Sequence, residues 1–429
     1  MKKSRYIFLP LPFIKGNLSR ILFALPSEIR RHGSASAGIL RAFAGRIQPR
    51  PFFAGLLLGA VTMLGLGKWA KRHDTFGDRI RFFQAVSPER GIYPTIDNLA
   101  AFVHGKADPE KILILVAGSS IGLGIGQPEE DLWSRKLQED LGEGFSVVNV
   151  SFRSNRFNLI GIPLMEHLRR EFPRHILICD LWPLEQEPLP LRSQNPQFPY
   201  NYVAWQEVAA RLLRGELAAF HKIRAECLAG APAERSFIQE QVLSGLWETV
   251  TGASAFWNWV GYRLIFTANP FLHPLKPVFF EQDDDSRQHY LPSPERFKSN
   301  QKREVEIVAG QIVAARNLES SPAGEPEAAA TPCDPFPDDT LKRRTIFLMN
   351  SCSSYYLAQL PPQDRAYYED FVRRQAARLG TLGFGTAVLG LDYPHSFYVD
   401  GQHFSWEAAP AIAAAVAKEV RRLSREQGF

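Results

Sequence analysis

Short, fully apolar runs recur along the chain and alternate with segments whose apolar residues are spaced three and four positions apart. Such runs predict buried strands of a parallel sheet, and the segments between them predict amphipathic helices. The predicted strands are 112–116, 145–150, 175–181, 345–349 and 386–391. The predicted helices of the same region are 129–141, 159–172, 301–318, 366–379 and 406–423. Alternation of strand and helix is typical of βαβ units, so we expect a three-layer α/β domain with a parallel sheet.

The alternation is interrupted in the middle of the chain, where proline turns, aromatic clusters and amphipathic stretches replace it. Residues 183–318 are therefore predicted to form a large insertion that caps or flanks the core. The next segment, 319–343, is rich in Pro, Ala, Glu and Ser, which is typical of a flexible loop. The core then has two halves, 111–182 and 344–429, preceded at 73–110 by a polar connector with short helical pieces. Four tryptophans of the insertion are predicted to serve core or interface packing: Trp205, Trp247, Trp257 and Trp259.

A different hydrophobic pattern lies near the N-terminus, where residues 51–67 read PFFAGLLLGAVTMLGLG without a charge. At about 1.5 Å per residue this run is roughly 25 Å long, and flanking side chains such as Arg50, Lys68 and Trp69 can reach the interfaces of a ~30 Å hydrocarbon core. We predict one transmembrane helix over 51–69. A buried core helix is the alternative, whereas a cleaved signal peptide is disfavoured because a long basic segment precedes the run.

Charge is distributed unevenly along the chain. Residues 1–72 hold thirteen Lys or Arg and one acidic residue, Glu28, a balance of +12. The whole chain carries +5, so residues 73–429 carry −7. A nucleic-acid partner is therefore not expected, while the basic segment 1–50 fits an anionic membrane surface. Basic residues flank both ends of the span, but the acid-poor N-terminus favours a cytoplasmic segment, an inner-membrane helix and a periplasmic domain.

The chain has four cysteines, Cys179, Cys227, Cys333 and Cys352, and none forms a Cys-x-x-Cys pair. No metal site is predicted. Cys179 lies in an apolar strand and is expected in the core. A Cys333–Cys352 disulfide is compatible with an extracytoplasmic domain, and the sequence leaves it open.

The first predicted strand ends in the turn GSSIGLG, from Gly118 to Gly124, where a helix is predicted to begin. Backbone N–H groups in such a turn can stabilise an oxyanion. Its G-x-S-x-G pattern matches the nucleophile elbow of α/β-hydrolases, but that elbow requires several upstream strands. Its G-x-x-x-G-x-G pattern matches the dinucleotide turn of short-chain dehydrogenases, with Arg153 or Arg156 toward an NADP 2′-phosphate. The chain has no Tyr-x-x-x-Lys, the catalytic pair of those dehydrogenases.

An acid and an imidazole three residues apart, Asp400 and His403, lie in the segment DGQHFSW just ahead of the last predicted helix. Such a pair can form a relay with a serine, in which the imidazole takes the serine proton and the carboxylate holds the imidazole. A helix cap with a surface histidine is the structural alternative. A second Asp-x-x-His, Asp392 and His395, ranks lower because a proline-containing loop surrounds it.

Four segments together resemble the SGNH, or GDSL-type, hydrolase superfamily: VAGSSIGLG, DLWSRKLQEDL, VVNVSF and DGQHFSWEAAPAIA. The resemblance covers about 112–181 and 345–423. It implies a flavodoxin-like core in which Ser120 is the nucleophile, Asp400 the orienting acid and His403 the general base. It also implies an oxyanion hole formed by the backbone N–H groups of Ser120 and Ser151.

The chain departs from the family pattern at three places. Ser119 replaces the usual Asp before the nucleophile, which makes Ser119 the second candidate for that role. Ser151 replaces the glycine of the second block. The third block, Gly-x-Asn-Asp in the family, is here Cys179-Asp-Leu-Trp182, so the asparagine donor is missing. Loss of one oxyanion donor typically costs about 100- to 1000-fold in rate.

Membrane-anchored proteins of this superfamily handle acyl groups on envelope polymers in D-alanylation and polysaccharide O-acetylation pathways. The resemblance therefore implies a cofactor-free esterase or O-acyltransferase acting on an ester-linked acyl group of an envelope polysaccharide or lipid, with a multi-span membrane acyltransferase as a partner. A non-catalytic envelope protein that keeps the SGNH fold is the first alternative. An NADP-binding protein is the weaker one.

Overall fold

The computed structural model describes residues 49–73, 94–152, 155–182, 191–192, 201–266, 294–320, 336 and 338–429. Its centre is a five-stranded parallel sheet with the order β2-β1-β3-β4-β5. The strands are β1 (Ile112–Val116), β2 (Phe145–Asn149), β3 (His175–Leu181), β4 (Thr345–Asn350) and β5 (Gly385–Leu389). This order is one of those found in doubly wound α/β sheets. The predicted α/β class and parallel sheet are confirmed, with every strand within two residues of its predicted ends.

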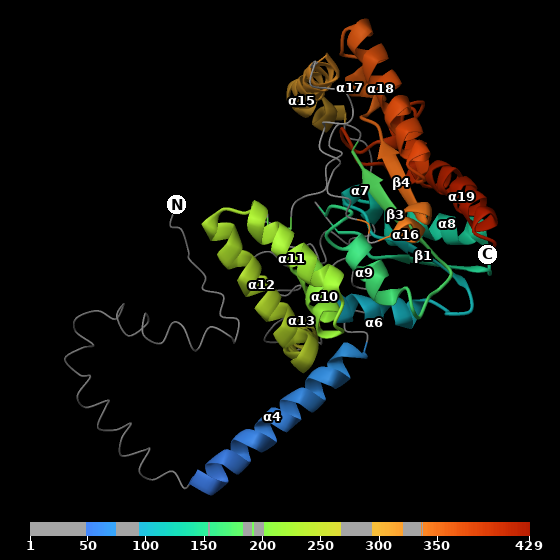
Figure 1. The fold of residues 1–429 in the computed structure, drawn as a ribbon. Coiled ribbons are helices and arrows are strands. Elements are labelled where there is room, and N and C mark those ends of the chain that lie inside the picture. Colours follow the sequence, from blue (N-terminus) through green and yellow to red (C-terminus); the bar gives the residue numbers. More distant parts are fainter. Residues whose placement is uncertain are drawn as a thin grey trace.

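Helices cover both faces of the sheet (Figure 1). Side chains of β1 alternate between two cores, with Leu113 and Leu115 on one face and Ile114 and Val116 on the other. The elements packed on the first face are α6 (Ile96–Lys106) and α9 (Gly161–Leu168), and those on the second are α8 (Trp133–Leu141) and α19 (Ala409–Glu426). The remaining elements around β4 and β5 are α16 (Asp339–Arg343), α17 (Ser354–Leu357), α18 (Pro362–Thr381) and the 3-10 turns η8 (His395–Phe397) and η9 (Trp406–Ala408).

Part of the predicted connector is a core helix. Residues 74–93 lie outside the described residues, but Thr95 caps the N-terminus of α6, and its hydroxyl accepts the Asn98 N–H. Leu99 and Val103 of α6 are fully buried in the same core as α9. The predicted helical piece is therefore present, but the polar character expected of the connector is corrected for the second half of 73–110, because the apolar face of α6 covers the sheet.

The insertion adds four helices to the α6–α9 side and one beside α17 and α18: α10 (Asn201–Leu213), α11 (Leu217–Ala229), α12 (Pro232–Thr251), α13 (Ala253–Phe266) and α15 (Pro294–Ser320). α10 is the link to the core, since its Trp205 is fully buried and Gly245 of α12 packs so closely that an added Cβ would lie 2.8 Å from Ala209. The insertion therefore shares the core of the sheet domain. Of the loop predicted at 319–343, residues 321–335 and 337 lie outside the described residues, and 339–343 is helical.

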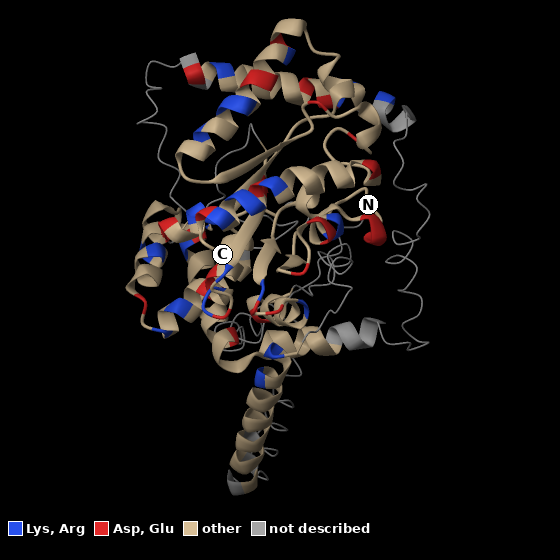
Figure 2. Ribbon diagram, turned by 90° about the vertical axis from the view of Figure 1, so that its right-hand side faces the viewer, with Lys and Arg blue, Asp and Glu red and all other residues tan. Residues whose placement is uncertain are grey.

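The N-terminal apolar run forms α4 (Pro49–Lys71). Its segment Phe53–Lys71 is the one stretch among the described residues that is long and apolar enough to cross a membrane, with a mean hydropathy of 1.5. Only 12% of the tested window is buried against the rest of the protein. In Figure 2 α4 projects from the domain, with basic residues where it joins the domain. The predicted apolar helix is confirmed; its position in a membrane stays a prediction.

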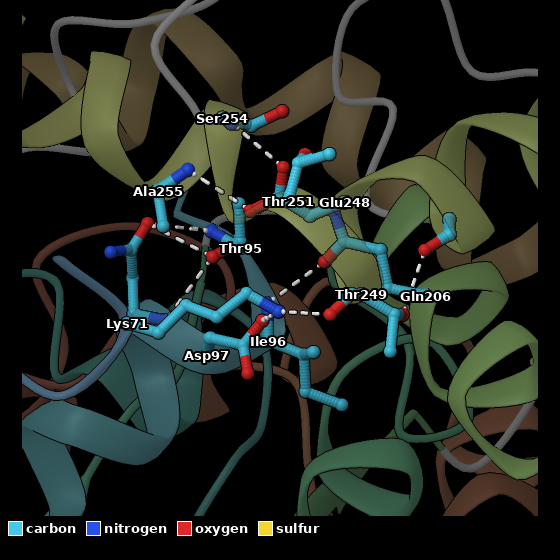
Figure 3. Close-up of polar contacts among 12 residues, drawn as sticks. Lys71, Thr95, Ile96, Asp97, Gln206, Glu248, Thr249, Thr251, Ser254 and Ala255 are labelled. Atoms are coloured by element: carbon cyan, nitrogen blue, oxygen red, sulfur yellow. Dashed lines mark hydrogen bonds and ion pairs between the residues drawn. The ribbon is translucent and has the colours of Figure 1, made fainter. Parts of the chain in front are cut away.

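A polar junction ties the last turn of α4 to the insertion and to α6 (Figure 3). The Lys71 ammonium lies 2.9 Å from the Asp97 carboxylate and donates to the Thr249 carbonyl at 3.0 Å. The buried Glu248 carboxylate accepts the N–H groups of Ser254 and Ala255 at the start of α13. At Gly67 an added Cβ would overlap the carbonyl oxygen of Thr251, which shows how closely α4 and α12 approach.

Candidate active site

The functional residues expected from the sequence gather at the carboxyl ends of the parallel strands. β1 leads into Ser119 and Ser120, and Ser120 begins the one-turn helix α7 (Ser120–Leu123). The loop after β5 brings Asp400 and His403 to the same edge. Parallel strands end at a common edge, where open α/β sheets bind their ligands, so residues 280 positions apart can meet there.

Ser120, His403 and Asp400 form a continuous chain of hydrogen bonds. His403 Nε2 lies 2.9 Å from Ser120 Oγ, and His403 Nδ1 lies 2.7 Å from Asp400 Oδ2. Both distances are within the reach required for a nucleophile and its base and for a base and its orienting acid. The side chains of Asp400 and His403 are about one third and one fifth exposed, at 31% and 22%, so the chain of contacts is accessible from solvent.

The backbone of the same loop holds Asp400 in its ionised form. Its Oδ1 accepts the N–H groups of Gln402 and His403 at 2.9 and 2.8 Å. Burial alone would raise the pKa of Asp400, but the hydrogen bond and charge of His403 and these two N–H groups outweigh it and lower the pKa below its usual value. An ionised Asp400 stabilises the imidazolium that forms when His403 accepts a proton.

The two candidate serines have different partners. Ser119 donates both its N–H and its hydroxyl to the Asp180 carboxylate at the end of β3. The Ser120 hydroxyl instead meets His403. Burial raises the pKa of Asp180, and the hydrogen bonds from Ser119 offset this only in part. The geometry therefore assigns Ser120 to the histidine and Ser119 to holding the turn.

The glycines of the turn are explained by close packing. An added Cβ at Gly118 would overlap Asp180 Oδ1, and one at Gly122 would lie 2.6 Å from Ser151 Oγ. Ser151 also accepts the Gly118 N–H at 2.9 Å. Side chains thus fill the space next to both glycines, whereas a dinucleotide turn keeps such space for the pyrophosphate. α7 is also a single turn, not the longer helix of that motif.

The Ser151 N–H is engaged within the protein. It donates to Asn149 Oδ1 at 3.0 Å, and the Asn149 amide donates in turn to the Gly122 carbonyl at 2.8 Å. Ser151 is buried. Its assignment as an oxyanion donor stays a prediction, which now requires that this hydrogen bond be shared or released. The Ser120 N–H, as the first of α7, has no acceptor inside the helix.

The second Asp-x-x-His does not take part in this chain of contacts. Asp392 is exposed, and the His395 ring packs against Tyr355 with 5.0 Å between ring centroids. Cys352 is a buried free thiol, and Cys333, its partner in the disulfide that the sequence left open, lies outside the described residues. Arg153 is also outside them.

Three residues near the site were not found by sequence reasoning. Asp180 and Asn149 brace the turn through the contacts described above. Glu304 of α15 lies beside the site loop, since an added Cβ at Gly401 would be 2.9 Å from its Oε2. Burial, and then the charge of Asp400, raises the pKa of Glu304. Of these three residues, only Asp180 and Asn149 could have been found from the sequence, because they are polar residues at the carboxyl ends of apolar strands.

Within the part of the chain that the structure describes, no group of three or more His, Cys, Asp or Glu side chains could hold a metal ion. Comparison with known proteins gave no relatives: no family model, curated protein or solved structure matches the chain.

Proposed function

We propose that this protein is a membrane-anchored serine esterase or O-acyltransferase of the SGNH type. The observation that carries the proposal is the hydrogen-bonded series Ser120–His403–Asp400, with distances of 2.9 and 2.7 Å. The strand order, which is that of flavodoxin-like sheets, supports the SGNH core implied by the sequence motifs. Because one fold hosts many functions, the side chains at the strand ends carry more weight than the fold.

In the proposed reaction Ser120 Oγ attacks the carbonyl carbon of an ester while His403 Nε2 takes the hydroxyl proton. The tetrahedral intermediate collapses, the leaving alkoxide takes that proton from His403, and an acyl-Ser120 ester remains. Water or a sugar hydroxyl then attacks the acyl carbon and gives its proton to His403. Release of the acyl group returns the proton to Ser120 Oγ. Hydrolysis and transfer differ only in this acceptor.

The proposed substrate is an acylated envelope polysaccharide or lipid, and the proposed location is the inner membrane, with the domain on the periplasmic side. Support comes from α4, which is long and apolar enough to span, and from the acid-poor basic segment before it. A multi-span acyltransferase is the proposed membrane partner, because a single anchor helix offers no path for an acyl donor across the bilayer.

Labelling with a fluorophosphonate probe tests the activated serine. The detergent-solubilised wild type and Ser119→Ala should both label, whereas Ser120→Ala should not. Ser119→Ala is the matched control, because it removes a neighbouring hydroxyl that is bonded to Asp180 instead of His403. A wild type that stays unlabelled under conditions where known SGNH esterases react would overturn the proposal in favour of a non-catalytic envelope protein.

A further inference from the structure

The insertion exposes far more large apolar side chains than the sheet domain does. On α10 to α13 these are Leu213, Leu217, Phe220, Leu228, Leu243, Trp247, Val250 and Trp257. Elsewhere in the described residues, outside α4, the exposed large apolar side chains are Ile307, Val313 and Leu382. Scattered apolar side chains on a surface are ordinary, but a concentration on one set of helices indicates an interaction surface.

Three of these side chains form a stripe along α12. Leu243, Trp247 and Val250 follow the spacing i, i+4, i+7 of one helix face, and they are 64%, 50% and 54% exposed. Gly245, which packs on α10, lies roughly 140° to 160° around the helix from each of them at about 100° per residue. The stripe therefore points away from α10 and from the sheet behind it.

The stripe lies next to the end of the proposed membrane helix. Thr251 of α12 packs on Gly67, and Trp259 of α13 meets Trp69 edge-on with ring centroids 4.9 Å apart. α12 and α13 lie across the end of α4, while α4 extends away from the sheet (Figures 1 and 2). If α4 crosses a bilayer, helices that lie across its end run along the bilayer surface.

The chemistry of this region fits the interface between lipid and water. Between Val242 and Val260 the only charged residue is Glu248, which is buried and accepts the N–H groups at the start of α13. Lys68 and Arg72, in and just after the last turn of α4, are exposed. Tryptophans with nearby Lys and Arg are typical of helices that lie in a membrane interface.

The junction at the end of α4 makes this arrangement rigid. Lys71 bridges Asp97 of α6 and the Thr249 carbonyl of α12 (Figure 3). Asn258 of α13 also donates to Asn98 of α6 at 2.9 Å. α6 in turn belongs to the core of the sheet domain. The anchor, the α12 stripe and the sheet are therefore parts of one packed unit.

We infer that the α12–α13 corner, with Leu243, Trp247, Val250 and Trp257, is a membrane-interface surface that rests in the headgroup region of the bilayer spanned by α4. This inference rests on the proposed membrane anchor but not on the proposed esterase activity. It gives the insertion a role, which is to hold the carboxyl ends of the strands at a set height and orientation above the lipid.

Depth-dependent quenching tests this surface on the full chain in phospholipid vesicles. An environment-sensitive fluorophore is attached at Trp247→Cys or at Val250→Cys, in a background with Cys227 and Cys333 changed to Ser and the buried Cys179 and Cys352 retained. Nitroxide lipids labelled near the headgroup should quench both probes several-fold more than a probe at Leu382→Cys. Leu382 is the matched control, because it is 58% exposed and lies after α18, outside the insertion.

A probe at Val61→Cys in α4 separates the possible failures. It should be quenched best by nitroxides in the middle of the acyl chains. If it is quenched while the α12 probes behave like Leu382→Cys, the inference is overturned and the anchor stands. If Val61→Cys is not quenched, both the proposed anchor and the inference are overturned.

The α12 probes have one further outcome. If their emission is blue-shifted but no lipid quenches them, a protein covers the stripe, and the inference is overturned. Fluorophosphonate labelling of Ser120 on the same vesicles reports the esterase proposal separately.

Discussion

The strand-end loops and the junction at the end of α4 are both built from polar side chains, but they leave different groups exposed. At the junction, Lys71, Asp97 and Glu248 bond to one another or to backbone groups, and they hold four helices together. At the strand ends, Asp400 and His403 are also held by hydrogen bonds, but the series ends at the Ser120 hydroxyl on a partly exposed turn. A closed network stabilises an arrangement of helices, whereas an open one leaves a reactive group for a substrate.

The largest change in rate is expected for the hydrogen-bonded series of Ser120, His403 and Asp400. Asp400→Asn should lower the rate of fluorophosphonate labelling by about 10⁴-fold, because the amide no longer holds the required tautomer or stabilises the imidazolium. The asparagine oxygen can still accept the N–H groups of Gln402 and His403, so the melting temperature should change little. The rate is measured by gel fluorescence over time. A variant that folds normally and labels at the wild-type rate would remove Asp400 from the mechanism.

Substitutions in the junction at the end of α4 should lower the free energy of unfolding and leave the rate of labelling unchanged. Lys71→Met leaves the Asp97 carboxylate, which is 19% exposed, without its cation. Breaking a fully buried pair costs about 3–5 kcal/mol, so this partly buried one should cost on the order of 2 kcal/mol in free energy of unfolding. Denaturant titration in detergent measures it. Lys68→Met on the exposed side of α4 is the matched control, and equal losses in the two variants would show that the junction contributes nothing.

Asp180 should affect both stability and reactivity, because its carboxylate stabilises the turn on which Ser120 lies. Asp180→Ala leaves the Ser119 N–H and hydroxyl without their acceptor and should cost about 1–3 kcal/mol in free energy of unfolding. It should also slow labelling of Ser120 by displacing the turn. Ser119→Ala removes one of the two hydrogen bonds and should have a smaller effect on both measurements. If Ser119→Ala is the more damaging of the two, Ser119 has a role beyond holding the turn.

The smallest effect is a pH dependence of opposite sign at two carboxylates, Glu166 on α9 and Asp400 at the strand ends. Burial raises the pKa of Glu166 on α9 from 4.5 to about 7, and Arg169 and Arg211 offset this in part. The folded state therefore binds a proton more tightly than the unfolded state, and this group's contribution to stability falls as pH rises from about 4.5 to 7. Asp400, whose pKa is lowered, contributes stability above its unfolded value that is lost as pH falls below about 4.

Glu166→Gln tests the sign at α9. The variant should gain stability relative to the wild type, roughly 2 kcal/mol, as pH rises from 5 to 7, and the difference should level off above about pH 8. Unfolding free energies measured across this range give the slope. A loss of stability at pH 7 would mean that the ion pairs with Arg169 and Arg211 outweigh the burial of the carboxylate.

Much of the sheet domain was predictable because its signals are local. The fully apolar run at 112–116 and the helix pattern at 406–423 each reflect burial on a regular period, and both were predicted within a few residues. A helical piece was predicted in the connector, but its place in the core was not, because the apolar face of α6 is short and polar side chains such as Thr95 and Asn98 cap it. The way the insertion helices pack was not predictable either, since it depends on contacts between distant segments, such as Gly245 with Ala209.

The sequence by itself determined the apolar helix α4, the parallel α/β core and the pairing of Asp400 with His403, because each depends on residues that are close along the chain. Only the tertiary structure decided that Ser120 and not Ser119 meets His403, because that choice depends on where β3 places the Asp180 carboxylate. Only it revealed that Ser151 bonds to Asn149 and that the insertion exposes its apolar stripe beside α4. Contacts between distant segments depend on how helices and strands pack, and no local pattern in the sequence encodes that packing.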